Sequence, residues 1–475
     1  MAVTIQTAVH TIPSPRQLKW QEMEFYAFIH FGMNTFTGRE WGLGNEAPSL
    51  FKPEGLDASQ WVEVCKSAGM TGIILTCKHH DGFCLWPSDY TDYSLKASPW
   101  RNGRGDVVRE LAEACREHGL KLGIYLSPWD RHEPSYGDSP AYNAYFLNQL
   151  RELLTNYGHF FCVWFDGACG EGSNGMVQEY DWDAYYRAIR EMQPDAVISI
   201  CGPDVRWCGN EIGHTRKSEW SVVPETMKDN EIIQAKSQKK DDGTFSQRVD
   251  TTDEDLGSRT VLAKVDHVIW YPAEVDVSIR PRWFYHADDD DRVKSVDELI
   301  DLYESAVGGN SGLLLNIPPD RRGVIHENDA RNLREFGQWL RSTYGNDLAG
   351  KANVRASCTR DAVVDAKHVV DGCTDTFWCP PAGMEKAELE LDLGEEYVFN
   401  RIVLKEHIPS GQRIERFQLE YRQGERWVPL YEGTVVGYKK ICRLPQTKAR
   451  YLRLNITESR INPTLSGFGV YFSGR

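Results

Sequence analysis

The sequence predicts an α/β protein: a (β/α)8-like barrel over residues 1–346, followed by a C-terminal β-sandwich of jelly-roll type over residues 347–475. In the first part, short apolar runs alternate with amphipathic segments, which is typical of parallel strands covered by helices. From about Lys351 the pattern changes to two-residue alternation between turn residues, which is typical of a sandwich. A chain of 475 residues is also too long for one compact core.

The barrel strands are predicted from apolar runs that end in polar residues. The clearest run covers residues 160–165 and leads directly into Asp166 and Gly167. A run without polar alternation is typical of a strand buried on both faces. The other predicted strands cover residues 26–32, 72–80, 121–128, 196–202, 266–274 and 312–317.

The helices are predicted from apolar residues spaced three and four apart. They cover residues 57–69, 107–119, 141–157, 182–192, 296–307 and 328–344. Between residues 203 and 264 the pattern is irregular, and we expect long loops there with one strand near residues 219–223. In the C-terminal part, alternating strands are expected at residues 387–393, 401–404, 417–421 and 450–456.

The composition argues against several classes of partner. A net charge of −15 argues against nucleic acid, because binding phosphates requires a basic face. No apolar run approaches the roughly 20 residues of a membrane span, so we expect no membrane partner. The 12 cysteines are scattered and include no CxxC pair, so we expect buried hydrophobes rather than a zinc site. The 15 tryptophans and 21 tyrosines provide flat rings of the kind that stack on sugars.

The N-terminus shows neither a basic region nor an apolar region of a secretory leader. We therefore expect a cytoplasmic location for the chain as written. If a leader has been removed, the expected location is periplasmic or extracellular.

Polar side chains recur where the predicted barrel strands end: His30, His79, His80, Tyr125 and Asp166. Because the carboxyl ends of barrel strands form one face, we expect these side chains to share a site. Adjacent strand residues point to opposite faces, so neutral donors to substrate hydroxyls fit the histidine pair better than ligands of one metal ion. Asp166 is a candidate for chemistry, and the structural alternative is a cap of the next helix.

A second carboxyl group is needed if the chemistry is glycoside hydrolysis, which places two carboxyls across the scissile bond. The loop after the strand at residues 196–202 offers Glu211 and Glu219, both near tryptophans. Desolvation there would raise the pKa of a glutamate, as a general acid requires. The alternative is that both are solvated loop acids.

Five motifs follow one another across residues 15–345. They are HFG at residues 30–32, Glu40-Trp41, KHHDGF at 78–83, WFDG at 164–167 and LLNIPP at 314–319. Together they resemble the motifs of α-L-fucosidases of glycoside hydrolase family 29. The resemblance implies a retaining exo-enzyme that cleaves terminal α-L-fucose from an oligosaccharide or glycoconjugate through a covalent intermediate, with no metal or other cofactor.

The resemblance also implies a role for each matched residue. Asp166 matches the nucleophile. Positions that hold the fucose are matched by His30, Glu40, Trp41, His79, His80, Tyr125 and Trp164, and Trp283 aligns more loosely with a position that covers the C5 methyl group. The acid/base position varies within the family. The context of Glu211, together with EWGLGNE at residues 40–46, resembles the subfamily that cleaves α1,3/1,4-linked fucose of Lewis-type glycans, which favours Glu211 over Glu219.

The C-terminal part resembles a galactose-binding, discoidin-like β-sandwich through residues 371–378 (DGCTDTFW) and 406–413 (EHIPSGQR). The resemblance implies a module similar to a carbohydrate-binding domain, which either binds glycan or only braces the barrel. Asp371 and Asp375 are candidate ligands of a structural calcium ion.

Three alternatives remain at this point. The first is an α-L-fucosidase of broader specificity that acts on α1,2-linked or aryl fucosides, with Glu219 or another acid as proton donor. The second is a non-catalytic fucose-binding protein on the same barrel. The third is a metal-dependent hydrolase that uses His30, His79 and His80.

Overall fold

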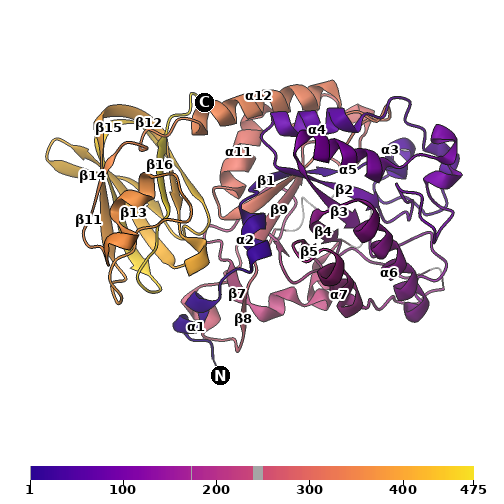
Figure 1. Ribbon diagram of the computed structural model, residues 1–475, viewed down its shortest axis with the longest axis horizontal. Coiled ribbons are helices and arrows are strands. Elements are labelled where there is room, and N and C mark those ends of the chain that lie inside the picture. Colours follow the sequence, from indigo (N-terminus) through magenta and orange to yellow (C-terminus); the bar gives the residue numbers. More distant parts are fainter. Residues whose placement is uncertain (1, 173, 239–249) are drawn as a thin grey trace.

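The computed structural model describes residues 2–172, 174–238 and 250–475. Figure 1 shows two parts: a barrel with its helices, and a β-rich C-terminal domain at one end. The long helix α12 (Glu327–Tyr344) runs along the molecule from the barrel toward that domain. Within the described ranges, no helix is long and apolar enough to cross a membrane.

The first part is built on an eight-stranded sheet in the order β5-β4-β3-β2-β1-β10-β9-β6, with all neighbours parallel. The bridge between Ser199 and Val205 joins its two edges, so the barrel is nearly closed and the predicted fold class is confirmed. The strands are β1 (Phe25–Ile29), β2 (Gly72–Lys78), β3 (Lys121–Leu126), β4 (Phe160–Phe165), β5 (Val197–Ile200), β6 (Arg206–Trp207), β9 (Ala273–Ser278) and β10 (Ser311–Asn316).

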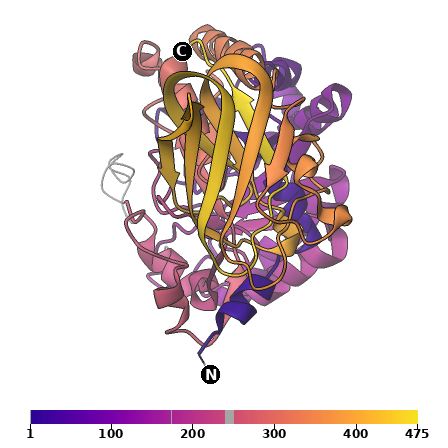
Figure 2. The ribbon, with the colours of Figure 1, turned by 90° about the vertical axis from the view of Figure 1, so that its left-hand side faces the viewer.

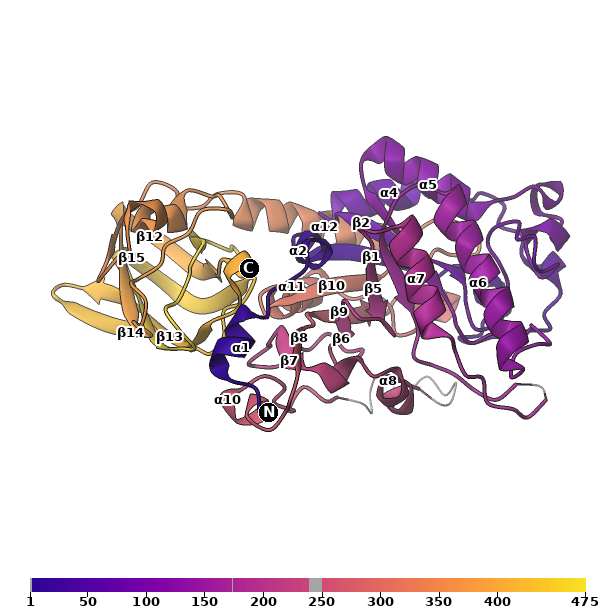
Figure 3. The same cartoon turned by 60° about the horizontal axis from the view of Figure 1, so that its bottom comes forward.

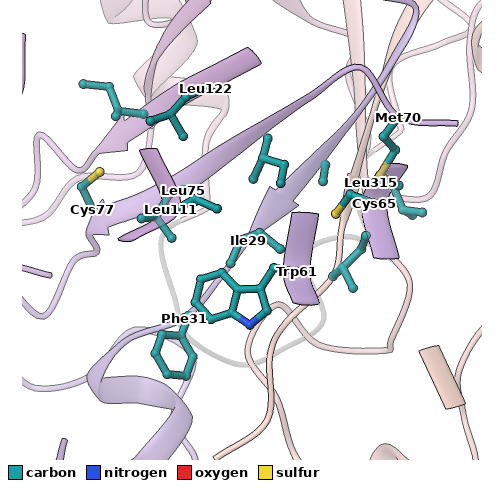
Figure 4. Close-up of a cluster of buried hydrophobic side chains, with 14 of the residues drawn as sticks. Ile29, Phe31, Trp61, Cys65, Met70, Leu75, Cys77, Leu111, Leu122 and Leu315 are labelled. Atoms are coloured by element: carbon teal, nitrogen blue, oxygen red, sulfur yellow. The ribbon is translucent and has the colours of Figure 1, made fainter. Parts of the chain in front are cut away.

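Side chains of the strands alternate between two hydrophobic layers. Tyr26 and Phe28 of β1 belong to the cluster inside the barrel, whereas Ile29 belongs to the larger cluster beneath the helices. Figure 4 shows Ile29 in that outer layer beside Trp61 of α4 (Ala58–Ser67). Most of the twelve cysteines are buried and all are free thiols, in agreement with the prediction.

The six helices predicted for the barrel are present, and polar caps fix where several of them begin. The N-terminal residues Asp57, Asp106, Asp181 and Ser295 each accept a hydrogen bond from a backbone N–H of the first turn. Besides α4 and α12, the predicted helices are α5 (Val107–His118), α6 (Ser139–Asn156), α7 (Trp182–Met192) and α11 (Val296–Ala306). Shorter helices that periodicity did not reveal are α1 (Ile5–His10), α2 (Pro15–Gln21), α3 (Met33–Thr37), α8 (Asn230–Lys236) and α10 (Arg259–Leu262).

The prediction of one barrel strand over residues 266–274 is wrong. Its first half is β8 (Val268–Trp270), which pairs antiparallel with β7 (Val222–Pro224) outside the barrel. The barrel strand β9 begins only at Ala273, after Pro272, which has no N–H to donate to a ladder. Figure 3 shows β7 and β8 beside β9 and β6. Strand β6 has two residues, which is too short to produce a periodic signal in what was expected to be loop.

The C-terminal domain is an antiparallel sheet of six strands, and Figure 2 shows it facing the viewer. The early half of β12 pairs with β11, and its later half pairs with β16. Both halves pair with β15, with a register shift between Asp392 and Tyr397. Two predicted strands, at residues 387–393 and 401–404, are therefore parts of one long strand. The strands are β11 (Asn353–Ala356), β12 (Ala387–Lys405), β13 (Ile414–Gln423), β14 (Arg426–Gly433), β15 (Lys440–Ser459) and β16 (Gly467–Tyr471).

Buried polar contacts fasten this domain to the barrel. Lys439 Nζ lies 2.6 Å from Glu24, and Arg401 Nε donates to Glu304 over 2.7 Å. Gln412, from the motif at residues 406–413, accepts a hydrogen bond from Ser221 N over 2.8 Å. Gln412 therefore contributes to the contact between the C-terminal domain and the barrel.

The candidate calcium ligand Asp371 has its carboxylate engaged locally. Its oxygens accept hydrogen bonds from Cys373 N over 2.8 Å and from the Thr376 hydroxyl over 2.7 Å. Among the residues that the structure describes, no group of three or more His, Cys, Asp or Glu side chains is arranged to hold a metal ion.

Candidate active site

A cavity opens at the carboxyl ends of the barrel strands, and every predicted site residue lines it. These residues are His30, Glu40, Trp41, His79, His80, Tyr125, Trp164, Asp166, Glu211 and Trp283. Glu219 does not line the cavity. The structure therefore brings together residues from seven separate stretches of the sequence. Those that follow barrel strands share one face, as expected.

Asp166 follows β4 directly and is held by two donors. The Tyr125 hydroxyl donates to Oδ2 over 2.9 Å, and Ala168 N donates to Oδ1 over 2.8 Å. The side chain is 24% exposed, so it is accessible from the cavity. The alternative role as a helix cap is excluded, because Asp181 caps the next helix, α7.

His30 and His80 are neutral and present acceptors to the cavity. Burial lowers the pKa of His30 to about 3 and that of His80 to about 4. Asn316 donates hydrogen bonds through Nδ2 to Ser278 Oγ and to the Trp283 carbonyl. Its Oδ1 therefore faces His30 and accepts a hydrogen bond from the N–H at Nδ1, 2.8 Å away. The Nε2 of His30 is then an unprotonated acceptor for a hydroxyl.

The same logic applies to His80. Ser127 Oγ donates to the Trp129 carbonyl over 2.6 Å, so it accepts from His80 Nδ1 over 2.7 Å. Nε2 of His80 therefore carries a lone pair, 3.7 Å from Asp166 Oδ2. His79 stacks on Tyr125, and its buried Nδ1 has no hydrogen-bond partner among the described residues. The free lone pairs of His30 and His80 suit the hydroxyl groups of a polyhydroxylated ligand. The expectation that the histidine pair donates is therefore wrong for His80, whose Nε2 is an acceptor because Nδ1 carries the proton.

Glu40 and Trp41 act on the rim of the cavity. Glu40 Oε2 accepts a hydrogen bond from Trp283 N over 2.8 Å, and Oε1 accepts one from His286 Nε2 over 2.9 Å. Glu40 thus ties the loop that carries Trp283 to the barrel, in addition to lining the cavity. Trp41 packs edge-on against His80 and Trp129, with ring centroids 5.7 and 5.0 Å away.

Glu211 lies on the loop after β6 and, within the part of the chain that the structure describes, has one weak donor, Trp283 Nε1, at 3.3 Å from Oε2. Desolvation, and after it the charges of Asp166 and Glu40, raise the pKa of Glu211 to about 8. It is therefore protonated at neutral pH, as a general acid must be. Glu219, by contrast, is 1% exposed and ion-paired with Arg206 and Arg216. Of the two candidates, only Glu211 reaches the cavity.

Two further carboxyl groups were missed by the sequence analysis. Glu274 and Asp276 lie two residues apart on β9, and both point into the barrel. Glu274 accepts a hydrogen bond from Trp164 Nε1 over 2.7 Å, and Asp276 accepts one from Trp207 Nε1 over 2.8 Å. Burial raises the pKa of Glu274 to about 7 and that of Asp276 well above its usual value. The signal that could have revealed them is the alternation of polar and apolar residues over 273–278. It indicates a strand whose polar side chains all lie on one face, which in this barrel is the inner face.

A βα barrel whose aromatic-lined cavity holds Asp166 together with Glu211, which is protonated at neutral pH, has the site of a glycoside hydrolase. Comparison with known proteins gives the family. The family model described as Alpha-L-fucosidase matches residues 6–346, and that of the F5/8 type C domain matches residues 353–466. The chain belongs to the α-L-fucosidase family and is a glycoside hydrolase, as its motifs predicted.

Relatives of the chain carry the same description. Alpha-L-fucosidase 1 of Arabidopsis thaliana is 44% identical, covering 98% of this chain and 88% of its own length. A solved putative α-L-fucosidase from Bacteroides ovatus is 45% identical with a TM-score of 0.85, covering 100% of this chain and 77% of that one. A family 29 fucosidase from Ruminococcus gnavus, solved with fucose, is 33% identical with a TM-score of 0.84, and the match covers 98% of this chain and 95% of that one. The family implies a fucosylated glycan as substrate.

Proposed function

We propose that this α-L-fucosidase is a retaining exo-enzyme that releases terminal α1,3/1,4-linked fucose from Lewis-type glycans through a fucosyl-Asp166 intermediate. The observation that carries the proposal is the pair of unlike carboxyls in one cavity. Asp166 accepts hydrogen bonds from two donors, whereas Glu211 is protonated at neutral pH because its pKa is raised to about 8.

In the first step, an Asp166 oxygen attacks the anomeric carbon of fucose and forms a C–O bond. The bond from that carbon to the glycosidic oxygen breaks, and Glu211 gives its proton to this oxygen, so the shortened glycan leaves as an alcohol. The neutral histidines accept hydrogen bonds from fucose hydroxyls. Those contacts discriminate between sugars more strongly than the apolar wall beside the C5 methyl, which gives roughly 1–3 kcal/mol.

In the second step, Glu211 acts as a base. The negative charge of Asp166 is one cause of the raised pKa of Glu211, and esterification removes that charge. The pKa of Glu211 therefore falls in the intermediate, where a carboxylate is needed to deprotonate water. Water attacks the anomeric carbon, the bond to Asp166 breaks, and Glu211 regains a proton, so the β-fucosyl enzyme yields α-fucose.

The linkage specificity rests on the sequence context of Glu211 and on residues 40–46. We expect fucose release from a Lewis-type trisaccharide and at least about 100-fold slower release from 2′-fucosyllactose, measured as kcat/KM at pH 6. Equal rates on both glycans would contradict the linkage and leave a broader α-L-fucosidase. The anomeric form of the released sugar, followed by proton NMR, tests retention in the same reaction.

A further inference from the structure

The two carboxyls on β9 each hold one tryptophan of the cavity. Glu274 accepts the indole N–H of Trp164, and Asp276 accepts that of Trp207. Asp276 stands one inward position further along the strand, and the catalytic face lies at that end. Trp164 is already assigned to the fucose by its motif, whereas no role has been assigned to Trp207 or Asp276.

Trp207 points into the cavity, whereas the preceding residue, Arg206, points away from it. Strand β6 consists only of Arg206 and Trp207, and successive strand residues face opposite sides. Arg206 is buried outside the cavity in its ion pair with Glu219, and its Nε donates to the Tyr271 carbonyl over 2.9 Å. The half-buried ring of Trp207 therefore lines the cavity together with Glu211 and Asp276.

The position of Glu211 shows which part of a glycan these residues meet. A general acid must contact the glycosidic oxygen, so it lies on the side where the leaving sugar departs. Trp207 precedes Glu211 by four residues on the same segment. Asp276 lies near enough to Glu211 for their charges to interact. Both residues thus line the same part of the cavity as the proposed general acid.

We infer that Trp207 is the stacking platform for the pyranose ring that leaves with the glycosidic oxygen, and that Asp276 is the positioning residue that holds its indole. The inference rests on the proposed function, since it needs a glycan as leaving group. A ring with its N–H anchored loses little side-chain freedom when a sugar binds. The apolar C–H face of a hexose is the complementary surface.

The test compares two substrates that place the same fucose in the cavity. A Lewis-type trisaccharide has a leaving sugar, whereas α-L-fucosyl fluoride has none. We expect Trp207→Ala to lower the ratio of kcat/KM values, trisaccharide over fluoride, by about 10- to 100-fold. The matched control is Tyr125→Phe, which touches Asp166; it acts on both substrates, so the ratio changes by less than about threefold.

A pair of Asp276 variants isolates the positioning role. Asp276→Asn and Asp276→Leu both remove the ionisable carboxyl group, but only Asn keeps an oxygen that accepts the indole N–H. At pH 6, where Glu211 remains protonated, Leu should lower the ratio toward the value of Trp207→Ala, and Asn should keep it within about threefold of the wild type. Equal ratios in the Leu and Asn variants would overturn the role of Asp276.

Two results overturn the platform itself: an unchanged ratio in folded Trp207→Ala, which includes an equal loss on both substrates, or a fall in the ratio no larger than that in Tyr125→Phe. The proposed function is judged separately, on the wild type alone. If the wild type prefers 2′-fucosyllactose, the linkage proposal fails, and the ratio is measured with that glycan instead of the trisaccharide.

Discussion

Two carboxyl groups that line the cavity, those of Asp166 and Glu211, lie in contrasting surroundings. Asp166 ends a buried strand and receives hydrogen bonds from Tyr125 and Ala168. Glu211 is on a loop, has a single donor at 3.3 Å among the described residues, and faces the charges of Asp166 and Glu40. The proposed roles rest on this difference. Two donors hold Asp166, the proposed nucleophile, whereas burial and neighbouring charges oppose ionisation of Glu211, the proposed acid.

The largest expected effect follows from removing the strand-end carboxylate. Asp166→Asn keeps the shape but lacks the nucleophilic oxygen, so kcat/KM on every fucoside should fall by about 10⁴-fold or more. The control is Asp195→Asn, which changes an exposed acid paired with Lys19 and should leave the rate unchanged. A variant at Asp166 that keeps a tenth of the activity would mean that another group attacks the fucose.

The loop carboxyl of Glu211 should matter wherever a proton must be given or taken. Glu211→Gln should lower kcat/KM on a Lewis-type trisaccharide by about 10²- to 10⁴-fold. The rate of the first step on α-L-fucosyl fluoride should fall much less, because fluoride leaves without protonation. The burst of fluoride release measures the rate of that step. A similar loss on both substrates would show that Glu211 serves binding and not proton transfer.

The comparison can also be sharpened by pH. Glu211 has a pKa of about 8 in the free enzyme, so its acid form is lost as the pH rises through that value. The rate kcat/KM on the trisaccharide should therefore fall on the alkaline side, by about tenfold per pH unit well above pH 8, while fluoride release in the first step stays nearly constant. An alkaline limb below pH 6 would contradict the assignment.

Glu219 should affect stability rather than catalysis. It is buried against Arg206 and Arg216, and Glu219→Gln leaves these cations without a counter-charge. We expect the free energy of unfolding to fall by about 3–5 kcal/mol, whereas kcat/KM of the folded fraction stays within about threefold. Thermal unfolding and active-site titration separate these two quantities. A folded variant that is inactive would restore Glu219 as a candidate acid.

The sequence predicted the barrel where strands are long and apolar, as for residues 160–165, because burial on both faces leaves no polar alternation. It did not predict β6, which has two residues, or the division of residues 266–274 by Pro272 into β8 and β9. Pairing outside the barrel is a tertiary choice that no local pattern encodes.

For the site, the sequence identified the polar residues at strand ends and, through the family resemblance, those on the rim. It could not separate Glu211 from Glu219 on chemistry alone, because both are loop acids near tryptophans. The difference is made by Arg206 and Arg216, which neutralise Glu219 in the fold. Asp276 was missed because an acid inside a barrel strand resembles one that faces solvent.

The most direct test of the division of roles is to trap the intermediate. A 2-deoxy-2-fluoro-α-L-fucosyl fluoride slows both steps but keeps a good leaving group for the first, so the fucosyl enzyme should accumulate and be seen by intact-protein mass spectrometry. Peptide mapping should then locate the added sugar on Asp166 in the WFDG segment. An adduct on Glu211, or steady turnover with α-fucose released and no adduct at all, would contradict the account.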